Sequence, residues 1–188
     1  AGALNGTVGA TTPNTGAFTT LTSSSDATIH GLTVGLGAGS GNAQNTALGI
    51  YNLGVNTTGS NNVAVGFSAM ASNTTGNDNN AVGRIALSSN TTGYNNDAFG
   101  TNSLYGNTTG NNNAAFGHFS LTSTTTGIAN AAFGSQALAA NTTGSYNTGL
   151  GANSLASNTT ASYNTAVGYQ AGYSNTTGYS NNAIGTQA

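Results

Sequence analysis

The sequence contains no cysteine and, among its 188 residues, only one basic and three acidic side chains. Without cysteine there are no disulfides, no thiolate metal sites and no thiol nucleophiles. A single basic residue, Arg84, does not make the positive surface that binds nucleic acid or anionic lipid. No apolar run approaches the ~20 residues of a membrane helix. We therefore expect no nucleic-acid partner and no membrane insertion.

Asparagine, glycine, threonine and serine dominate what is present, and they recur with a fixed period. A glycine preceded by an apolar residue returns every 17 residues, nine times, without insertion or deletion. A disordered low-complexity segment has no need of such registry, so the period predicts an array in which each repeat is one turn of a stack. These glycines are Gly49, Gly66, Gly83, Gly100, Gly117, Gly134, Gly151, Gly168 and Gly185.

Numbered from the asparagine of "NTTG", the repeat reads N-T-T-G-x-x-N-x-A-[VF]-G-x-x-[AS]-L-x-x. Position seven is always asparagine. In a stack these amides would lie above one another and hydrogen-bond along the axis as a ladder; a local turn-capping role is the alternative, and the two are compatible. The residues are Asn45, Asn62, Asn79, Asn96, Asn113, Asn130, Asn147, Asn164 and Asn181.

The pattern favours two short strands per repeat, near positions seven to eleven and thirteen to sixteen. We expect "NTTG" to be the corner between them, where asparagine and glycine supply the backbone conformations of a tight turn. Helical spacing fits poorly, because the apolar positions ten and fifteen are five apart. Alternation sends positions seven, nine and eleven to one face and eight, ten and twelve to the other. We expect core or interface roles for Val65, Val82, Phe99, Phe116, Phe133, Leu150 and Val167 at position ten, and for Leu87, Leu104, Leu121, Leu138 and Leu155 at position fifteen.

The expected fold is thus an all-β parallel solenoid, a β-roll or β-helix with 17-residue turns. With roughly 4.8 Å per turn, nine repeats would make a rod of about 43 Å. Each repeat offers few large apolar residues against the cost of ordering it, so one chain has little core. We expect association into an intertwined homotrimer with a continuous apolar axis; a flat dimer would also bury the apolar face.

Residues 1–38 lie outside the period and are interpreted as an N-terminal β adaptor or cap, with strand-like segments "AFTTLT" (17–22) and "ATIHGLTV" (27–34). Residues 39–188 hold the nine repeats. The last repeat stops at its position fourteen, Ala188, and the first residue is not methionine, so we expect a fragment of a longer polypeptide.

The repeats resemble known families. The units "NTTGSNNVAVGFSAM" (56–70) and "NTTASYNTAVGYQAG" (158–172) resemble the repeats of bacteriophage tail-fibre shafts, and "TTPNTGAFTTLT" (11–22) is similar to segments common in phage fibres. The "NxAVG" core resembles the "SVAIG"-type motif in the heads of trimeric autotransporter adhesins, which implies a left-handed parallel β-roll trimer. Those heads have turns shorter than 17 residues. The resemblance implies architecture and supplies no catalytic residues.

Residues capable of acid-base or metal chemistry are few and lie in variable positions. Asp78 and Asp97 could act as an acid-base pair, but solvated turn positions explain them better. His30 and His118 are single histidines without companion ligands. We expect no catalytic residue, no cofactor and no bound metal.

Three surface features leave alternatives open. The paired threonines would stack into columns that suggest ice binding, although only one column would be exposed. Each "NTT" is also a formal N-glycosylation sequon. Exposed tyrosines could stack on sugars or anchor a partner, or simply pack on neighbouring turns. The tyrosines are Tyr94, Tyr146, Tyr163, Tyr169, Tyr173 and Tyr179.

These features together predict a non-enzymatic structural fibre, the shaft of a phage tail fibre that presents a distal receptor-binding element for host attachment. Its expected partners are further copies of itself, other fibre or baseplate proteins of the virion, and a host-surface glycan as an open possibility. The alternative is a bacterial surface adhesin or extracellular filament whose repeat surface binds glycan or ice. Either protein would be located on a virion or an extracellular surface.

Overall fold

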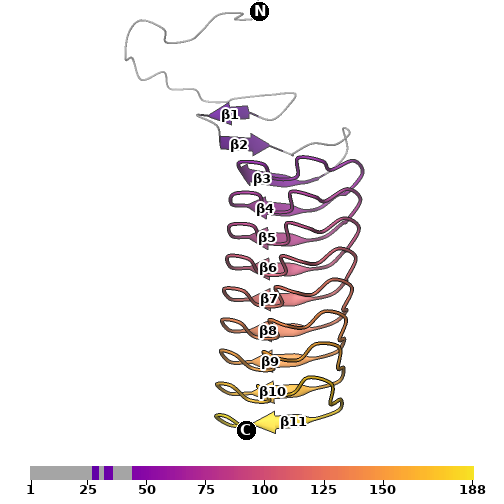
Figure 1. Cartoon of the computed structure of the whole chain (residues 1–188). Helices are drawn as coiled ribbons and strands as arrows, with labels where there is room; N and C mark the ends of the chain where they lie inside the picture. The colour runs from indigo at the N-terminus through magenta and orange to yellow at the C-terminus, as the bar shows by residue number, and fades with distance from the viewer. Residues whose placement is uncertain (1–26, 30–31, 36–43) are drawn as a thin grey trace, which may run out of the picture.

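The computed structural model describes residues 27–29, 32–35 and 44–188, and in the last range it is a column of stacked coils (Figure 1). Each repeat makes one coil with one short strand, and the strands lie above one another in a single sheet of order β1 to β11. The strands of the stack are β3 (Thr46–Gly49), β4 (Val63–Val65), β5 (Asn80–Val82), β6 (Asp97–Phe99), β7 (Ala114–Phe116), β8 (Ala131–Phe133), β9 (Thr148–Leu150), β10 (Thr165–Val167) and β11 (Asn182–Ile184).

Every pair of neighbouring strands from β3 to β11 is parallel and in a register of one repeat. Ala64 of β4 pairs with Ala81 of β5, which pairs with Ala98 of β6, and the same holds along the stack. The predicted parallel β-solenoid with 17-residue turns is therefore confirmed. No helix among the described residues is long and apolar enough to cross a membrane.

Two antiparallel strands precede the stack. β1 (Ala27–Ile29) pairs antiparallel with β2 (Leu32–Gly35), and β2 pairs antiparallel with the first coil strand, β3. The segment "ATIHGLTV" is thus two strands and not the single strand predicted from the sequence. The other strand-like segment, 17–22, and His30 lie outside the described residues, and the division of the chain at residue 38 stays a prediction.

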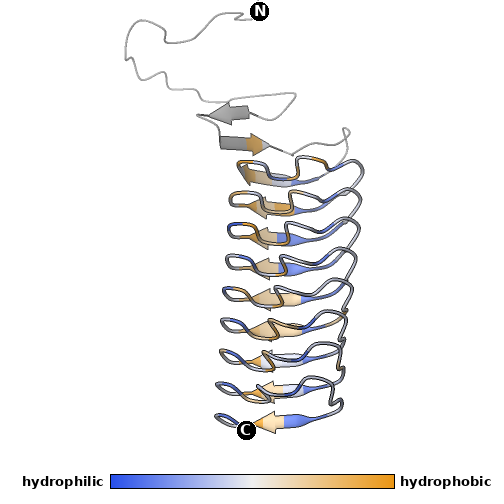
Figure 2. Ribbon diagram, viewed as in Figure 1, coloured by the Kyte–Doolittle hydropathy of each residue, from blue (hydrophilic) through white to orange (hydrophobic). Residues whose placement is uncertain are grey.

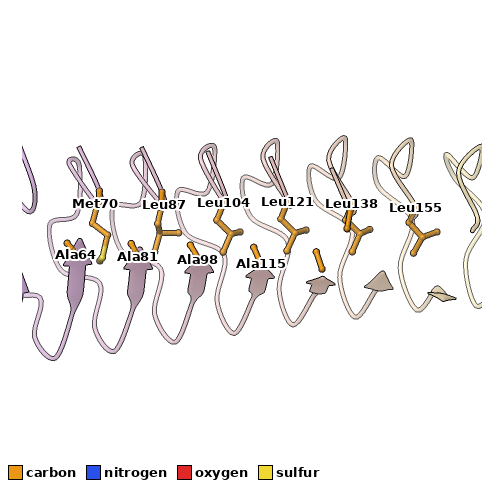
Figure 3. Close-up of a cluster of buried hydrophobic side chains, with 14 of the residues drawn as sticks. Ala64, Met70, Ala81, Leu87, Ala98, Leu104, Ala115, Leu121, Leu138 and Leu155 are labelled. Carbon is orange, nitrogen blue, oxygen red and sulfur yellow. The ribbon is translucent and has the colours of Figure 1, made fainter. Parts of the chain in front are cut away.

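The interior of the coil is narrow and apolar. Position nine, on the inward face of the strand, is alanine in nearly every repeat and is buried, and the leucine at position fifteen is buried opposite it. Figure 3 shows both as columns, with Leu104 lying beside Ala98 and Leu121 beside Ala115. Position fourteen adds a buried alanine in several coils, such as Ala86 and Ala137, so one large and one or two small apolar side chains per coil fill the space between the walls.

The second strand predicted at positions thirteen to sixteen is wrong, because that segment is a run of turns. Positions thirteen and fifteen adopt left-handed backbone conformations, as in Ile85 (φ 59°) and Leu87 (φ 52°). This conformation is unfavourable for a branched or bulky residue. It recurs because it turns the position-fifteen leucine into the core, where its burial offsets the cost.

The two recurrent glycines serve different needs. At position eleven the backbone has φ between 126° and 146°, a region open essentially to glycine alone. The position-four glycines of "NTTG" do not have positive φ, contrary to the prediction that they supply a special turn conformation. They are required by close approach, because a Cβ at Gly59 would overlap the carbonyl oxygen of Gly76 in the next coil.

Ala161 occupies the position-four slot in one repeat, and the hydrogen bonds around it are altered. The Thr159 N–H lies 3.2 Å from the Thr176 carbonyl oxygen, whereas the equivalent bond one coil earlier, from Thr142 to Thr159, is 2.7 Å. The side-chain amide of Asn164 donates to the Gly178 carbonyl oxygen at 2.8 Å, and it approaches Oδ1 of Asn158, at 3.5 Å, instead of its equivalent in the preceding coil. A methyl group is therefore accommodated at this corner by loosening the contacts between coils.

Replacing the position-eleven glycine should destabilise the stack. In Gly100→Ala the new Cβ would lie 2.6 Å from the Gly117 carbonyl oxygen, at φ 138°. We expect the free energy of unfolding to fall by about 3 kcal/mol or more, measured by urea denaturation. The matched control is Gly54→Ala, where nothing lies within 4 Å of the added methyl group and no loss is expected. Equal stability of the two variants would contradict this account of the coil spacing.

Candidate interaction surface

The position-seven asparagines form a continuous hydrogen-bonded column inside the stack. In Asn79 both the backbone N–H and the side-chain amide donate to Oδ1 of Asn62, at 3.0 and 3.1 Å, and the second amide hydrogen points to the Gly93 carbonyl oxygen at 2.9 Å. Asn96 repeats these three contacts one coil later. The side chain is fully buried at Asn62, Asn79 and Asn96, so each amide is satisfied by the neighbouring coils.

A second asparagine column runs through position one, which sequence reasoning treated only as a corner. Asn90 donates its side-chain amide to Oδ1 of Asn73 at 2.8 Å and to the Gly93 carbonyl oxygen at 3.0 Å. Both columns thus meet at the position-four carbonyl oxygen, since Asn79 donates to Gly93 as well. The signal that could have revealed this column is the near-constant asparagine at position one.

The position-one column is interrupted at Thr124. Its hydroxyl donates to the Asn141 carbonyl oxygen at 3.2 Å, and no group reaches back to the buried Oδ1 of Asn107. The Asn141 amide approaches the Thr124 hydroxyl only at 3.5 Å. One acceptor is therefore left without a hydrogen-bond partner in the middle of the stack, which costs stability.

The two asparagine columns also affect the glycosylation and ice-binding alternatives that the "NTT" segments leave open. The asparagines of these sequons from Asn73 to Asn158 are buried and their amides are used in the stack, so a glycan on them is incompatible with the folded coil. The position-two threonine turns its hydroxyl to the next coil, as from Thr74 to the Thr91 carbonyl oxygen at 2.9 Å. Only the position-three threonines are exposed in every repeat, so the surface presents a single threonine column.

The outward face of the strands carries one uninterrupted apolar column, the position-ten column. It consists of Leu48, Val65, Val82, Phe99, Phe116, Phe133, Leu150, Val167 and Ile184. Although strands β4 to β10 bury their central residue, which is alanine except for Gly149 in β9, the position-ten residues remain half-buried or exposed, with exposed fractions of 36% at Phe99 and 49% at Leu150. The strand register places Val65 beside Val82 and Phe99 beside Phe116, and in Figure 2 the strands of the stack are hydrophobic toward their arrowheads.

Aromatic rings reinforce the centre of this column. Phe99 and Phe116 stack with ring centroids 4.8 Å apart, and Phe116 and Phe133 stack at 4.9 Å, both pairs nearly parallel. The distance between the ring centroids equals the distance between neighbouring coils, so phenylalanines at the same position of consecutive coils stack on each other. The stacking covers the ring faces but leaves the outer edges as an apolar ridge.

Positions eight and twelve flank the ridge. Position eight is half-buried through most of the stack and carries residues such as Val63, Asn80 and Asp97. Position twelve is more exposed and includes Phe67 at 45% and Tyr169 at 50%. Positions eight, ten and twelve therefore form one outward surface, here called the strand face.

The titratable residues Asp78, Asp97 and His118 do not come together in one site. Asp78 accepts a hydrogen bond from the Asn61 amide at 3.1 Å, and Asp97 accepts one from the Asn80 amide at 2.7 Å, so each continues the polar contacts of its own column. His118 packs edge-on against Phe119 at the surface, with centroids 4.2 Å apart. Within the described residues there is no group of three or more side chains suited to hold a metal ion.

The tyrosines are exposed, and two of them stack on each other. Tyr146 and Tyr163, both at position six, have parallel rings 5.1 Å apart. Tyr179 is the most exposed of the tyrosines at 73%. Packing on the neighbouring coil therefore accounts for the positions of Tyr146 and Tyr163.

Comparison with known proteins adds no further constraint. No family model, no curated protein and no solved structure matches the chain. Within the described residues, the strand face is a continuous outward surface that carries an apolar column from Leu48 to Ile184.

Restoring the interrupted asparagine column should stabilise the protein. In Thr124→Asn the new amide can donate to Oδ1 of Asn107 and accept from Asn141, as its equivalents do. We expect a gain of about 1–2 kcal/mol, measured as a higher urea midpoint. Thr126→Asn, at the exposed position three of the same repeat, is the control and should leave the midpoint unchanged. A Thr124→Asn midpoint at or below that of the wild type would contradict the assigned role of the unpaired oxygen.

Proposed function

We propose that the chain is a structural shaft of a bacteriophage tail fibre, a homotrimeric solenoid that holds a receptor-binding element away from the particle. The observation that carries this proposal is the position-ten column. Nine apolar side chains in an unbroken line are half-buried or exposed on one chain, and a stripe of this kind on an ordered surface favours a protein partner.

A second copy of the same chain fits this stripe better than a flat or globular partner. The column repeats at the coil spacing, so another solenoid presents apolar residues at the same intervals. Three strand faces turned toward a common axis would enclose the ridge in an apolar core between the chains, in addition to the narrow core inside each chain. Two faces would cover the ridge but leave the flanking residues more exposed.

The mechanical role follows from the hydrogen bonds between coils. Backbone and asparagine side-chain hydrogen bonds run along the axis at every repeat, so bending or opening one coil breaks several of them at once. Such a rod resists proteases and transmits force. The resemblance of the repeats to tail-fibre shafts supports this use, with other fibre or baseplate proteins joined at the ends of the rod.

A charged residue in the position-ten column should disperse the trimer. Phe116→Asp removes an aromatic contact and places a carboxylate in the enclosed core, so we expect the dissociation constant to rise by roughly two orders of magnitude or more. Sedimentation equilibrium should give three times the 18.3 kDa chain mass for the wild type and lower masses for the variant. Thr109→Asp, at the exposed position three, is the control and should remain trimeric. A wild-type mass of one or two chains would refute the trimer.

The biological assignment is tested by localisation. We expect antibodies against residues 44–188 to label the tail fibres of virions from the encoding source in negative-stain electron microscopy. Labelling of the bacterial cell surface in place of virions would favour the adhesin or extracellular filament instead.

A further inference from the structure

The few charged side chains of the described chain are gathered in two neighbouring coils. Asp78 and Arg84 belong to the repeat of β5, and Asp97 belongs to the repeat of β6. Arg84 is at position twelve and Asp97 at position eight, so both lie on the strand face, on opposite sides of the position-ten column. No other coil of the stack carries an arginine, lysine, aspartate or glutamate.

Arg84 and Asp97 lie apart from each other within one chain. Positions eight and twelve are separated by four residues of extended backbone, roughly 13 Å, with the apolar ridge between them. Asp97 is half-buried and accepts the amide of Asn80 at 2.7 Å, while Arg84 is exposed. The sole arginine of the stack thus projects at one flank while its nearest acid on this face occupies the other.

A threefold arrangement brings the two flanks together. This step rests on the proposed trimer. When three identical faces surround an axis, all strands run in the same sense around it, so the position-twelve flank of one protomer meets the position-eight flank of the next. Arg84 and Asp97 are 13 residues apart along the coil, less than one full turn, so they lie within one coil spacing of each other along the axis.

The flanks also match in polarity at this level. One coil earlier, the position-eight and position-twelve residues are the apolar Val63 and Phe67. In the coils of β5 and β6, position eight carries Asn80 and then Asp97, and position twelve carries Arg84. Polar residues on the position-twelve flank therefore lie at the same height along the axis as polar residues on the position-eight flank. An interface between identical chains requires such a match.

We propose that Arg84 of one protomer pairs with Asp97 of the next and that this ion pair fixes the axial register of the trimer. A regular solenoid needs such a device, because sliding one chain by a whole coil leaves the apolar ridge almost equally well packed. A slide of one coil places Arg84 opposite Asn80 or Ala114 in place of Asp97, and the charge pair is lost.

The first experiment compares two isosteric charge removals in the full chain by sedimentation equilibrium. Asp97→Asn keeps a side chain that the same slot already holds at Asn80, and Asp78→Asn keeps one that its slot holds at Asn61. We expect Asp97→Asn to weaken trimer formation about tenfold at low salt and Asp78→Asn to leave it unchanged. Equal behaviour of the two variants would overturn the assignment to Asp97.

The second experiment exchanges the charges. Arg84→Glu alone should weaken the trimer by a similar or larger factor, through repulsion from Asp97, and the double variant Arg84→Glu, Asp97→Lys should recover most of the wild-type affinity. Recovery is a readout that simple destabilisation of the fold would not give. A wild-type trimer with no recovery in the double variant would overturn the ion pair and leave the trimer standing, whereas a monomeric wild type would refute the proposed function itself.

The third experiment tests the head-to-tail symmetry directly. The chain has no cysteine, so the double variant Arg84→Cys, Asp97→Cys has only two thiols. A short bismaleimide should link them between neighbouring chains and give covalent dimers and trimers on a denaturing gel. A product that stops at two chains would indicate an isologous dimer and overturn the proposed register.

Discussion

The structure depends on hydrogen bonding between residues that occupy the same place in consecutive coils. Strand backbones, corner backbones and both asparagine columns all direct their donors along the axis to a neighbouring coil. A coil that gained or lost one residue would shift every one of these pairs at once. The fixed 17-residue period is therefore a condition of the fold, and it explains why nine repeats contain no insertion.

This axial bonding also decides the shape of the interior. Because the buried asparagines occupy one part of each coil, the apolar part has room in most coils for only one leucine or methionine and one or two small residues. The remaining large apolar residue of the repeat, at position ten, must lie outside. An exposed apolar ridge is thus a consequence of the same geometry that makes the coil narrow, and it gives the solenoid a reason to associate.

The sequence was sufficient to predict the features of the fold that the 17-residue repeat imposes. The period gave the parallel stack, and the alternation of asparagine, alanine and glycine at positions seven, nine and eleven gave one strand with its inward face. It was insufficient where local backbone preference is overridden: Ile85 and Leu87 adopt left-handed conformations that their side chains disfavour, so a strand was predicted where turns occur. The role of Gly59 was also misjudged, because a close approach between coils is visible only in three dimensions.

Regularity gives the stack its stiffness and at the same time removes information about position. In a perfect repeat every coil would fit every other coil of a neighbouring chain, and no register would be preferred. The residues that depart from the consensus are consequently the ones able to carry specificity. Thr124 leaves the buried Oδ1 of Asn107 without a hydrogen-bond partner, whereas Arg84 and Asp97 occupy outward positions where variation costs the coil little. Specificity can therefore accumulate on the strand face without disturbing the hydrogen bonds that hold the coils together.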